Sequence, residues 1–249
     1  MRLLTELRLA ASFLTVVPFG GSLSPSRRRM ARSMAYFPLV GLGIGLLLAL
    51  LNAALSSLLP RAVLDCLLLL VLILVTGGLH LDGLADLTDG LCGGRDRDRI
   101  LLIMKDSRVG AMGAVALVMV LLLKYLALYQ ISPEYKTSAL LFMPLCGRWV
   151  QVILAVFCPY ARPEGGTGAS FVEHAGEREF LMSTGFALLA ALMLFGMQGV
   201  FLFFLVGLLG MGLMKYFLNR LGGVTGDILG ASCEIVEVAV LVLLPAVLR

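Results

Sequence analysis

Three aspartates recur at helical spacing in the segment HLDGLADLTDG, where Asp82, Asp86 and Asp89 stand four and three residues apart. On a helix that advances about 100° per residue, these side chains lie on one face, one above another. Three like charges on one face repel one another unless a counter-ion lies between them. Carboxylates without histidine or cysteine partners favour a hard cation, and Mg²⁺ keeps coordination positions open for phosphate oxygens. The spacing therefore predicts a site for Mg²⁺ or Mn²⁺ and a phosphorylated substrate. The alternative is that these aspartates cap helices and face water.

A second charged group follows in IMKDSRVGAMG, which carries Lys105, Asp106 and Arg108 immediately before an apolar stretch. Two cations beside one carboxylate suit a phosphate clamp with an additional metal-binding or basic carboxylate. The alternative is an ordinary charged helix end at a membrane surface. Asp96 and Asp98 in GGRDRDR, by contrast, indicate a solvated turn or helix start.

The third group is the glycine-rich segment NRLGGVTGDILGA. Glycines before a helix allow backbone amides to approach an anion closely. We expect this segment to face the aspartates across the substrate, or alternatively to be a plain turn in which Asp227 is an N-cap. Its candidate contacts are Asn219, Arg220, Gly222, Gly223, Thr225 and Asp227.

Two further polar residues stand near these groups. His80 points away from the aspartate face on a helical wheel. It is therefore either a contact to the ligands of the metal, a contact to the substrate, or a histidine packed at the membrane interface. Arg148 in PLCGRWVQ falls near the middle of an apolar stretch, where a charge indicates a functional role.

The elements that position these residues are helices in lipid. The chain has 249 residues, of which 59% are hydrophobic, and a mean hydropathy of +0.97. A water-soluble domain of this size cannot bury so much apolar surface. In lipid every backbone amide must be bonded internally, which predicts an all-α polytopic bundle. We expect about seven transmembrane helices within a single integral-membrane catalytic domain over residues 1–249: Met34–Leu59, Ala62–Leu79, Gly110–Gln130, Thr137–Phe157, Phe180–Met197, Gly199–Tyr216 and Ala231–Leu248.

Charge asymmetry sets the orientation of these helices. Fourteen of the twenty Lys and Arg residues lie in residues 1–33 and in the connections 80–109, 158–179 and 217–230. The positive-inside rule places these segments, and the active site, at the cytoplasmic face of the cell inner membrane, with the C-terminus opposite. The net charge of +4 is thereby explained without a nucleic-acid partner. The first seventeen residues, interrupted by Glu6 and Arg8, predict a short helix packed on the bundle.

The remaining charges and thiols have plainer interpretations. Lys124 and the Arg61/Asp65 pair lie near the far membrane surface, where snorkelling explains them. The five cysteines show no CxxC spacing, and four of them fall in or at the edges of apolar spans, which favours buried, unreactive thiols over a metal site or a disulfide framework. A transporter is the alternative from a different class of protein, but it would show more polar residues at mid-span and less asymmetric loops.

Six segments together resemble the cobalamin synthase family, the adenosylcobinamide-GDP ribazoletransferases. They are GGLHLDGLADLTDGL, IMKDSRVGAMG and NRLGGVTGDILGA, with ASFLTVVPFG, YFPLVGLGIG and PLCGRWVQ outside the charged loops. The resemblance covers essentially the whole chain with the motifs in order. It implies a membrane enzyme that uses Mg²⁺ to join adenosylcobinamide-GDP, a corrinoid nucleotide, to α-ribazole or its 5′-phosphate, with release of GMP. The sequence leaves a homo-oligomer open.

On this resemblance we assign roles as a hypothesis. Mg²⁺ binds Asp82, Asp86 and Asp89, with Asp106 or Asp227 as a shared ligand. Pyrophosphate oxygens bind the catalytic cations Lys105 and Arg108, together with Arg220, and either Asp89 or Asp227 accepts the proton of the attacking ribose hydroxyl. Further substrate contacts are His80, Asp106, Arg148, Asn219, Gly222, Gly223 and Thr225.

A partial likeness to CDP-alcohol phosphotransferases gives the alternative enzyme function. DLTDGLCGGR matches part of their DxxDGxxAR pattern, but the arginine comes one position late and the later aspartates are missing. That family would imply a phospholipid head-group product.

Overall fold

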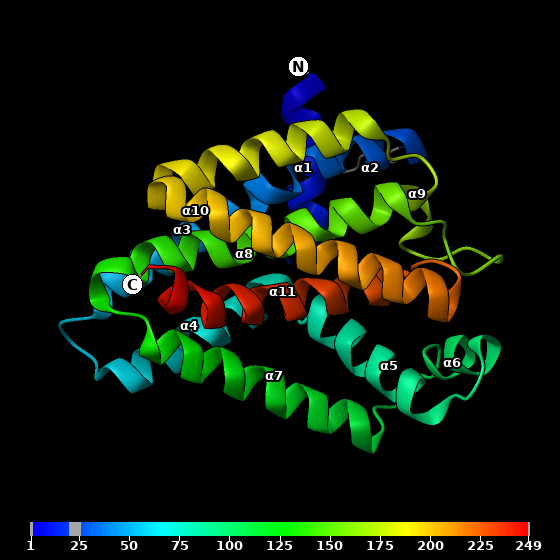
Figure 1. The fold of residues 1–249 in the computed structure, drawn as a ribbon, viewed down its shortest axis with the longest axis horizontal. Coiled ribbons are helices and arrows are strands. Elements are labelled where there is room, and N and C mark those ends of the chain that lie inside the picture. Colours follow the sequence, from blue (N-terminus) through cyan, green and yellow to red (C-terminus); the bar gives the residue numbers. More distant parts are fainter. Residues whose placement is uncertain (1, 20–25, 249) are drawn as a thin grey trace.

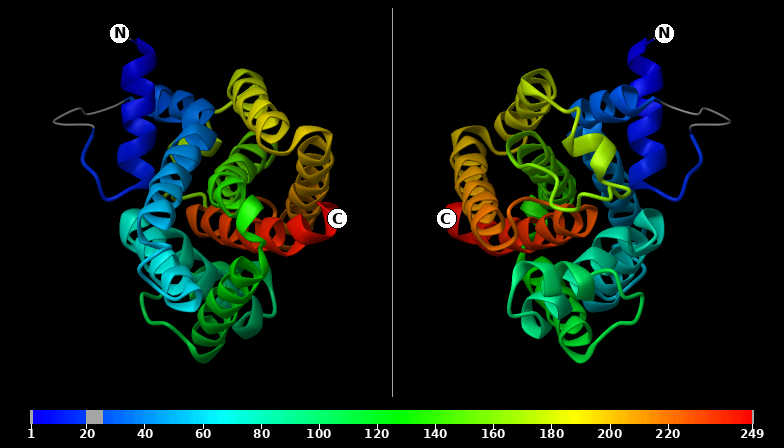
Figure 2. Two further views of the ribbon diagram at one scale, coloured as in Figure 1. Left: turned by 90° about the vertical axis from the view of Figure 1, so that its left-hand side faces the viewer. Right: turned by 90° about the vertical axis from the view of Figure 1, so that its right-hand side faces the viewer.

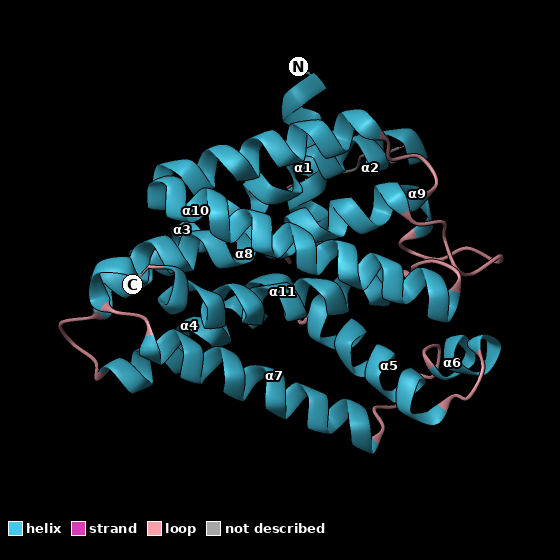
Figure 3. Ribbon diagram, in the orientation of Figure 1, coloured by secondary structure: helices cyan, strands magenta, loops and turns pink. Residues whose placement is uncertain are grey.

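The protein is an all-α bundle in a computed structural model that describes residues 2–19 and 26–248. Figure 3 shows helices joined by short loops throughout this part of the chain. Gly20 of the motif ASFLTVVPFG and Arg249 lie outside it. The helices are α1 (Arg2–Leu14), α2 (Arg27–Ser33), the 3₁₀ turn η1 (Met34–Tyr36), α3 (Phe37–Leu55), α4 (Arg61–Thr76), α5 (Leu79–Gly93), α6 (Arg97–Ile103), α7 (Ala111–Gln130), α8 (Pro133–Phe157), α9 (Ala169–Val172), α10 (Glu177–Leu221) and α11 (Gly226–Val247).

The apolar helices confirm a polytopic membrane protein. Five helices in the described chain are long and apolar enough to cross a bilayer, or six if α4 and α5 count together as one span. One of the five, α10, reverses direction at Gly196, where φ is 59° and ψ is −141°. Its two halves run back along each other in Figures 1 and 2. All seven predicted segments therefore contain helix, and the two expected on either side of residue 198 form this hairpin.

The segment after α4 differs from the prediction of one span at 62–79 followed by a loop. α4 ends at Thr76, and α5 begins at Leu79 at an angle of 89° to it. Gly77 and Gly78 make the bend with φ values of 61° and 69°, in the left-handed region that glycine adopts without steric cost. The predicted loop 80–109 therefore contains two helices, α5 and α6. The aspartates lie on a helix packed in the bundle, not on a solvated connection.

α8 is the central helix of the bundle, and α3, α10 and α11 surround it. Over its most apolar stretch, 83% of the residues are buried inside the protein. α11 also packs along α5, and the contact is close because Gly83 and Gly230 lack side chains there. A Cβ on Gly83 would stand 2.6 Å from the Asp227 carbonyl oxygen, and one on Gly230 would stand 3.1 Å from the His80 Cα. The helices that carry the two main motifs are thus in direct backbone contact.

Three connections gather at one end of the bundle, on the right of Figure 1. Arg97, at the start of α6, donates hydrogen bonds of 2.7 Å to the carbonyl oxygens of Leu221 and Ala161. Val224 pairs with the 158–168 connection, since its amide donates to the Pro159 carbonyl at 2.9 Å. α1 packs on α2 and α3 nearby, which confirms the predicted short N-terminal helix. The predicted clustering of the charged connections on one side is therefore found.

Candidate active site

The aspartate face of α5 is only partly free for a ligand. Asp82 is exposed and Asp86 is half-buried. Asp89, however, accepts hydrogen bonds from the amides of Gly110 and Gly113 at 2.6 and 2.8 Å. Negative charge at a helix N-terminus is stabilising, and both oxygens of Asp89 accept hydrogen bonds from amides at the start of α7. This geometry favours a capping role for Asp89 over the predicted metal or base role.

Asp227, in the first turn of α11, lies near the aspartate face of α5. Its backbone packs on Gly83 of α5, and its charge acts on Asp86 together with those of Asp82, Arg162 and Asp89. Thr225, not Asp227, is the N-cap of α11, because its hydroxyl accepts from the Ile228 amide at 3.3 Å. The alternative interpretation of Asp227 as an N-cap is therefore wrong.

Arg162 is the cation of this cluster, and it is not among the site residues predicted from the sequence. Its Nη2 lies 2.8 Å from Asp227 Oδ2, and the side chain is only 12% exposed. The same nitrogen lies 3.4 Å from the Met104 carbonyl oxygen, so the 158–168 connection reaches both the glycine segment and the end of α6. A single arginine in a loop belongs to no recognisable sequence pattern. The only nearby signal is the glycine-rich segment PEGGTG, which indicates a backbone that packs closely against another segment.

The glycine segment packs against another connection of the chain. Gly223 has a φ of 154°, and a Cβ on it would collide with the Pro159 carbonyl oxygen. Gly222, with a φ of 69°, ends α10. Gly223 thus lets the glycine segment pack closely on the backbone of the 158–168 connection, while an anion contact of these glycines stays a prediction. Thr225 is fully buried as the cap described above, which differs from its predicted substrate contact.

The end of α10 holds two other predicted contacts. Asn219 is exposed, and Arg220 donates to the carbonyl oxygens of Gly94 and Arg95 at 3.4 and 3.2 Å. Arg220 therefore joins α10 to the loop between α5 and α6.

The predicted phosphate clamp has protein partners in this structure. Lys105 contacts the Glu164 carboxylate, and Arg108 lies 2.6 Å from Asp106. The hydrogen bonds from Arg108 lower the pKa of Asp106 to about 2, so this carboxylate is ionised at neutral pH and is a poor base. Lys105 and Arg108 remain near the surface, where a phosphate can compete with these partners.

Arg148 belongs to a closed group of charges inside the bundle, away from the loops. Its guanidinium contacts Glu237, and Lys124 contacts both Glu237 and Glu234. Arg148 and Lys124 are each 1% exposed, so the predicted snorkelling of Lys124 is wrong and a substrate contact for Arg148 is not supported. The sequence did contain a signal, because Glu234 and Glu237 stand three residues apart and share a face of α11.

The Arg61/Asp65 pair is also not a snorkelling pair. Asp65 is fully buried and lies 2.6 Å from Lys136 Nζ and 3.8 Å from Arg61 Nε. These residues tie α4 to the start of α8.

The acidic cluster fits Mg²⁺ by its donor chemistry. In residues 2–19 and 26–248, no three His, Cys, Asp or Glu side chains are close enough to hold a metal as they stand. Mg²⁺ nevertheless needs only one or two carboxylates when water and phosphate oxygens complete its octahedron. Asp82, Asp86 and Asp227 gather three negative charges against the single positive charge of Arg162, an excess that a divalent cation would neutralise.

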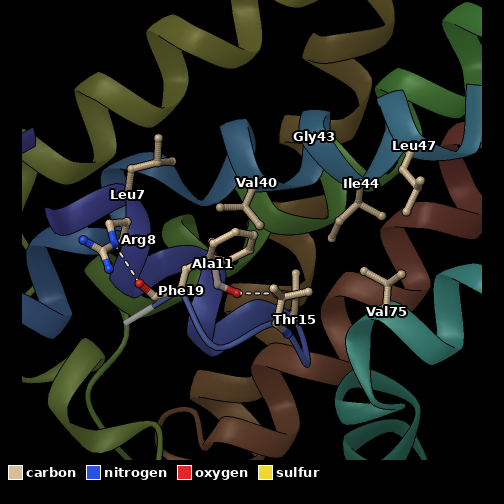
Figure 4. A pocket seen from close by; sticks show the side chains of 11 residues that line it. Leu7, Arg8, Ala11, Thr15, Phe19, Val40, Gly43, Ile44, Leu47 and Val75 are labelled. Carbon is tan, nitrogen blue, oxygen red and sulfur yellow. Dashed lines mark hydrogen bonds between the residues drawn. The ribbon is translucent and has the colours of Figure 1, made fainter. Parts of the chain in front are cut away.

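Two cavities meet near Asp82, and a third lies apart from it. A cavity of about 530 Å³ lies between Phe13, Gly78, Asp82 and Val109, and one of about 60 Å³ continues from Asp82 to His80 and Asp227. The third, about 430 Å³, is apolar and lies between α1 and α3 (Figure 4). Among the described residues its only charged lining residue is Arg8, whose Nε donates to the Phe19 carbonyl oxygen, and this cavity contains none of the carboxylates of the acidic cluster.

Comparison with known proteins now decides the family. The family model described as cobalamin-5-phosphate synthase matches residues 6–245. The chain belongs to the cobalamin-5-phosphate synthase family. An adenosylcobinamide-GDP ribazoletransferase of Geotalea daltonii is 42% identical over 96% of both chains. Proteins of the same name from Desulforamulus reducens and Pseudomonas fluorescens are 40% and 41% identical, over 96% and 94% of this chain and 96% of each relative. No solved structure matches this member of the cobalamin-5-phosphate synthase family.

Proposed function

We propose that the chain is an adenosylcobinamide-GDP ribazoletransferase. It joins adenosylcobinamide-GDP to α-ribazole or its 5′-phosphate and releases GMP, the last step of nucleotide-loop assembly. A ribose hydroxyl oxygen of the acceptor attacks the phosphorus attached to the cobinamide, the bond to the bridging pyrophosphate oxygen breaks, and the hydroxyl proton passes to a base. The family membership supports the activity.

The observation that carries the location of the site is the contact between α5 and the start of α11. About 140 residues separate Asp82 from Asp227 along the chain, yet Asp227 packs on Gly83. The carboxylates gathered there suit a metal-bound pyrophosphate. When bound, Mg²⁺ supplies charge neutralisation on the pyrophosphate oxygens.

Within this site we assign Asp82 and Asp86 to Mg²⁺, because their oxygens are not used for helix capping. Arg162 holds a pyrophosphate oxygen, with Lys105 and Arg108 as outer cations at the mouth. Asp227 accepts the proton of the attacking hydroxyl. Arg162 keeps Asp227 oriented before the acceptor binds.

We place this site at the cytoplasmic face of the inner membrane, on the charge bias of the connections. In a variant without the exposed thiols of Cys66 and Cys92, a cysteine introduced at Arg95, an exposed residue just after α5, should resist membrane-impermeant thiol reagents in intact cells and react after lysis. Labelling in intact cells would reverse the orientation.

Product analysis tests the activity. The purified protein in detergent, with adenosylcobinamide-GDP, α-ribazole and Mg²⁺, should release GMP and form a cobalamin without any gradient. Release of CMP from a CDP-alcohol, or gradient-dependent flux without turnover, would instead support one of the two alternative functions. The exposed Asp98→Asn variant is a matched control and should keep full activity, since Asp98 contacts only Arg97.

A further inference from the structure

His80 and Gln151 form a buried polar pair between α5 and α8. Gln151 Nε2 lies 3.0 Å from His80 Nε2 and 3.4 Å from the Leu229 carbonyl oxygen. Both hydrogens of the amide nitrogen are thus donated, so His80 Nε2 must act as the acceptor. The ring proton of a neutral histidine then lies on Nδ1. The tautomer of His80 follows from these two contacts of Gln151 Nε2.

This arrangement leaves one donor and one acceptor without protein partners. His80 Nδ1 and Gln151 Oε1 are both buried and unpaired, and the two side chains are 2% and 4% exposed. Such groups cost about 1–3 kcal/mol each when left unsatisfied, so a native structure provides them with a ligand or water.

Both side chains line the smaller cavity beside Asp82 and Asp227. Its lining also includes Phe13, Phe37 and Phe171, which pack together with ring centroids 4.5 to 6.2 Å apart. The cavity is therefore lined by aromatic rings, by a neutral polar pair and by two carboxylates.

We infer that His80 and Gln151 bind the acceptor's second ribose hydroxyl, the neighbour of the hydroxyl that attacks. A hydroxyl accepts from the His80 Nδ1–H and donates to an oxygen such as Gln151 Oε1, which matches both unpaired atoms in kind. The two unpaired atoms are one neutral donor and one neutral acceptor, a set that a hydroxyl satisfies but that neutralises neither a phosphate nor a cation. This inference rests on the proposed function.

The position of His80 and Gln151 explains why this cavity would recognise a vicinal diol. Asp227, the proposed proton acceptor, lines the same cavity as His80. Holding one hydroxyl of a vicinal diol at His80 and Gln151 limits the positions that the neighbouring hydroxyl can take relative to Asp227. His80 and Gln151 thereby act as specificity-determining contacts and take no proton.

Deoxy acceptors test the assignment. With the wild-type protein, the two monodeoxy forms of α-ribazole are compared with α-ribazole by GMP release. The form that lacks the attacking hydroxyl should give no product, and the other should lose about 10²-fold or more in kcat/KM. Gln151→Leu should lose a similar factor with α-ribazole, but the deoxy acceptor should then cost it less than about threefold, because the partner is already gone.

Matched variants keep the test decisive. Gln198→Leu, at the exposed α10 turn, should retain the wild-type discrimination. If Gln151→Leu does not accumulate, the comparison uses His80→Asn, which keeps a donor near the Nδ1 position, against His80→Leu. His80→Asn should discriminate better than His80→Leu. Equal losses with both acceptors in each variant, or a wild-type protein indifferent to the second hydroxyl, would overturn the inference. Absence of GMP release by the wild-type protein with α-ribazole would instead defeat the proposed function.

Discussion

Two groups of charges lie within this apolar chain, and they differ in balance. The inner group contains two cations, Lys124 and Arg148, and two carboxylates, Glu234 and Glu237. Each charge contacts an opposite one, and all four side chains are buried. The outer group contains Asp82, Asp86 and Asp227 with one cation, Arg162.

The difference separates structure from chemistry. A balanced buried group is complete as it stands and holds α7, α8 and α11 together. An unbalanced group beside a cavity needs charge from a ligand. Sign and number of charges, more than burial, therefore indicate which polar cluster binds a metal and a phosphate.

The largest expected effect is on catalysis by the outer group. Asp82→Asn or Asp86→Asn should each lower GMP release by about 10³-fold or more, because several kcal/mol of transition-state stabilisation depend on the metal. The protein should stay folded, and its thermal midpoint should be unchanged or slightly higher, since like charges are removed. GMP assays over a Mg²⁺ titration, with melting curves in detergent, measure both. Near-normal turnover in both variants would end the metal assignment.

The inner group should show the opposite pattern. Glu237→Gln leaves Arg148 and Lys124 short of their shared partner, which should lower the free energy of unfolding by about 3–5 kcal/mol. Glu234→Gln is the matched control with a smaller loss, because Lys124 keeps Glu237. Thermal melts in detergent measure the difference. A Glu237→Gln protein with an unchanged melting temperature but no activity would make this group catalytic and remove the contrast.

The loop that supports the outer group offers an intermediate effect. Gly223→Ala should reduce stability by roughly 1–3 kcal/mol through backbone strain, plus the collision with Pro159, and should reduce GMP release by displacing Arg162 and Asp227. Gly222→Ala should cost only about 1 kcal/mol, since the left-handed region is accessible to alanine and its Cβ meets only Arg97 at 3.4 Å. Expression level and GMP release distinguish the two. Equal behaviour of the two variants would contradict the role of this contact.

The smallest effect is expected at Asp106. Its pKa of about 2 lies below the unfolded value, so its contribution to stability is present above about pH 4 and is lost only as the pH falls toward 2. Between pH 5 and 8 it stays ionised, and Asp106→Asn should leave the shape of the pH–rate profile unchanged. A profile whose acidic limb disappears in this variant would make Asp106 the base.

Much of the fold could be predicted because hydropathy and charge are local properties. Apolar stretches identified the helices, and the spacing of Asp82, Asp86 and Asp89 placed them correctly on a helix. The bend at Gly77–Gly78 was missed because two glycines in a hydrophobic stretch do not reveal which conformation neighbouring helices impose on them.

The site was predicted less completely because pairing in space has no local signature. Asp89 was indistinguishable from Asp86 in sequence, and only the position of the α7 amides separates them. Arg162 and Glu237 acquire their roles from partners 65 and 89 residues away. The mean hydropathy of α11 also conceals its two glutamates, because their neighbours are strongly hydrophobic.

The reversal at Gly196 has a consequence for biogenesis. The turn contains no charged residue between Phe195 and Gly199, so nothing in it resists passage through the bilayer. The nearest cations on either side are Arg178 and Lys215, close to the two outer ends of the hairpin. In the orientation proposed above, the insertion machinery can therefore receive the two halves as one unit whose ends stay on the side of synthesis while the turn crosses. A lysine in place of Gln198 would oppose that crossing. The second half of α10 would then have two competing orientations during insertion.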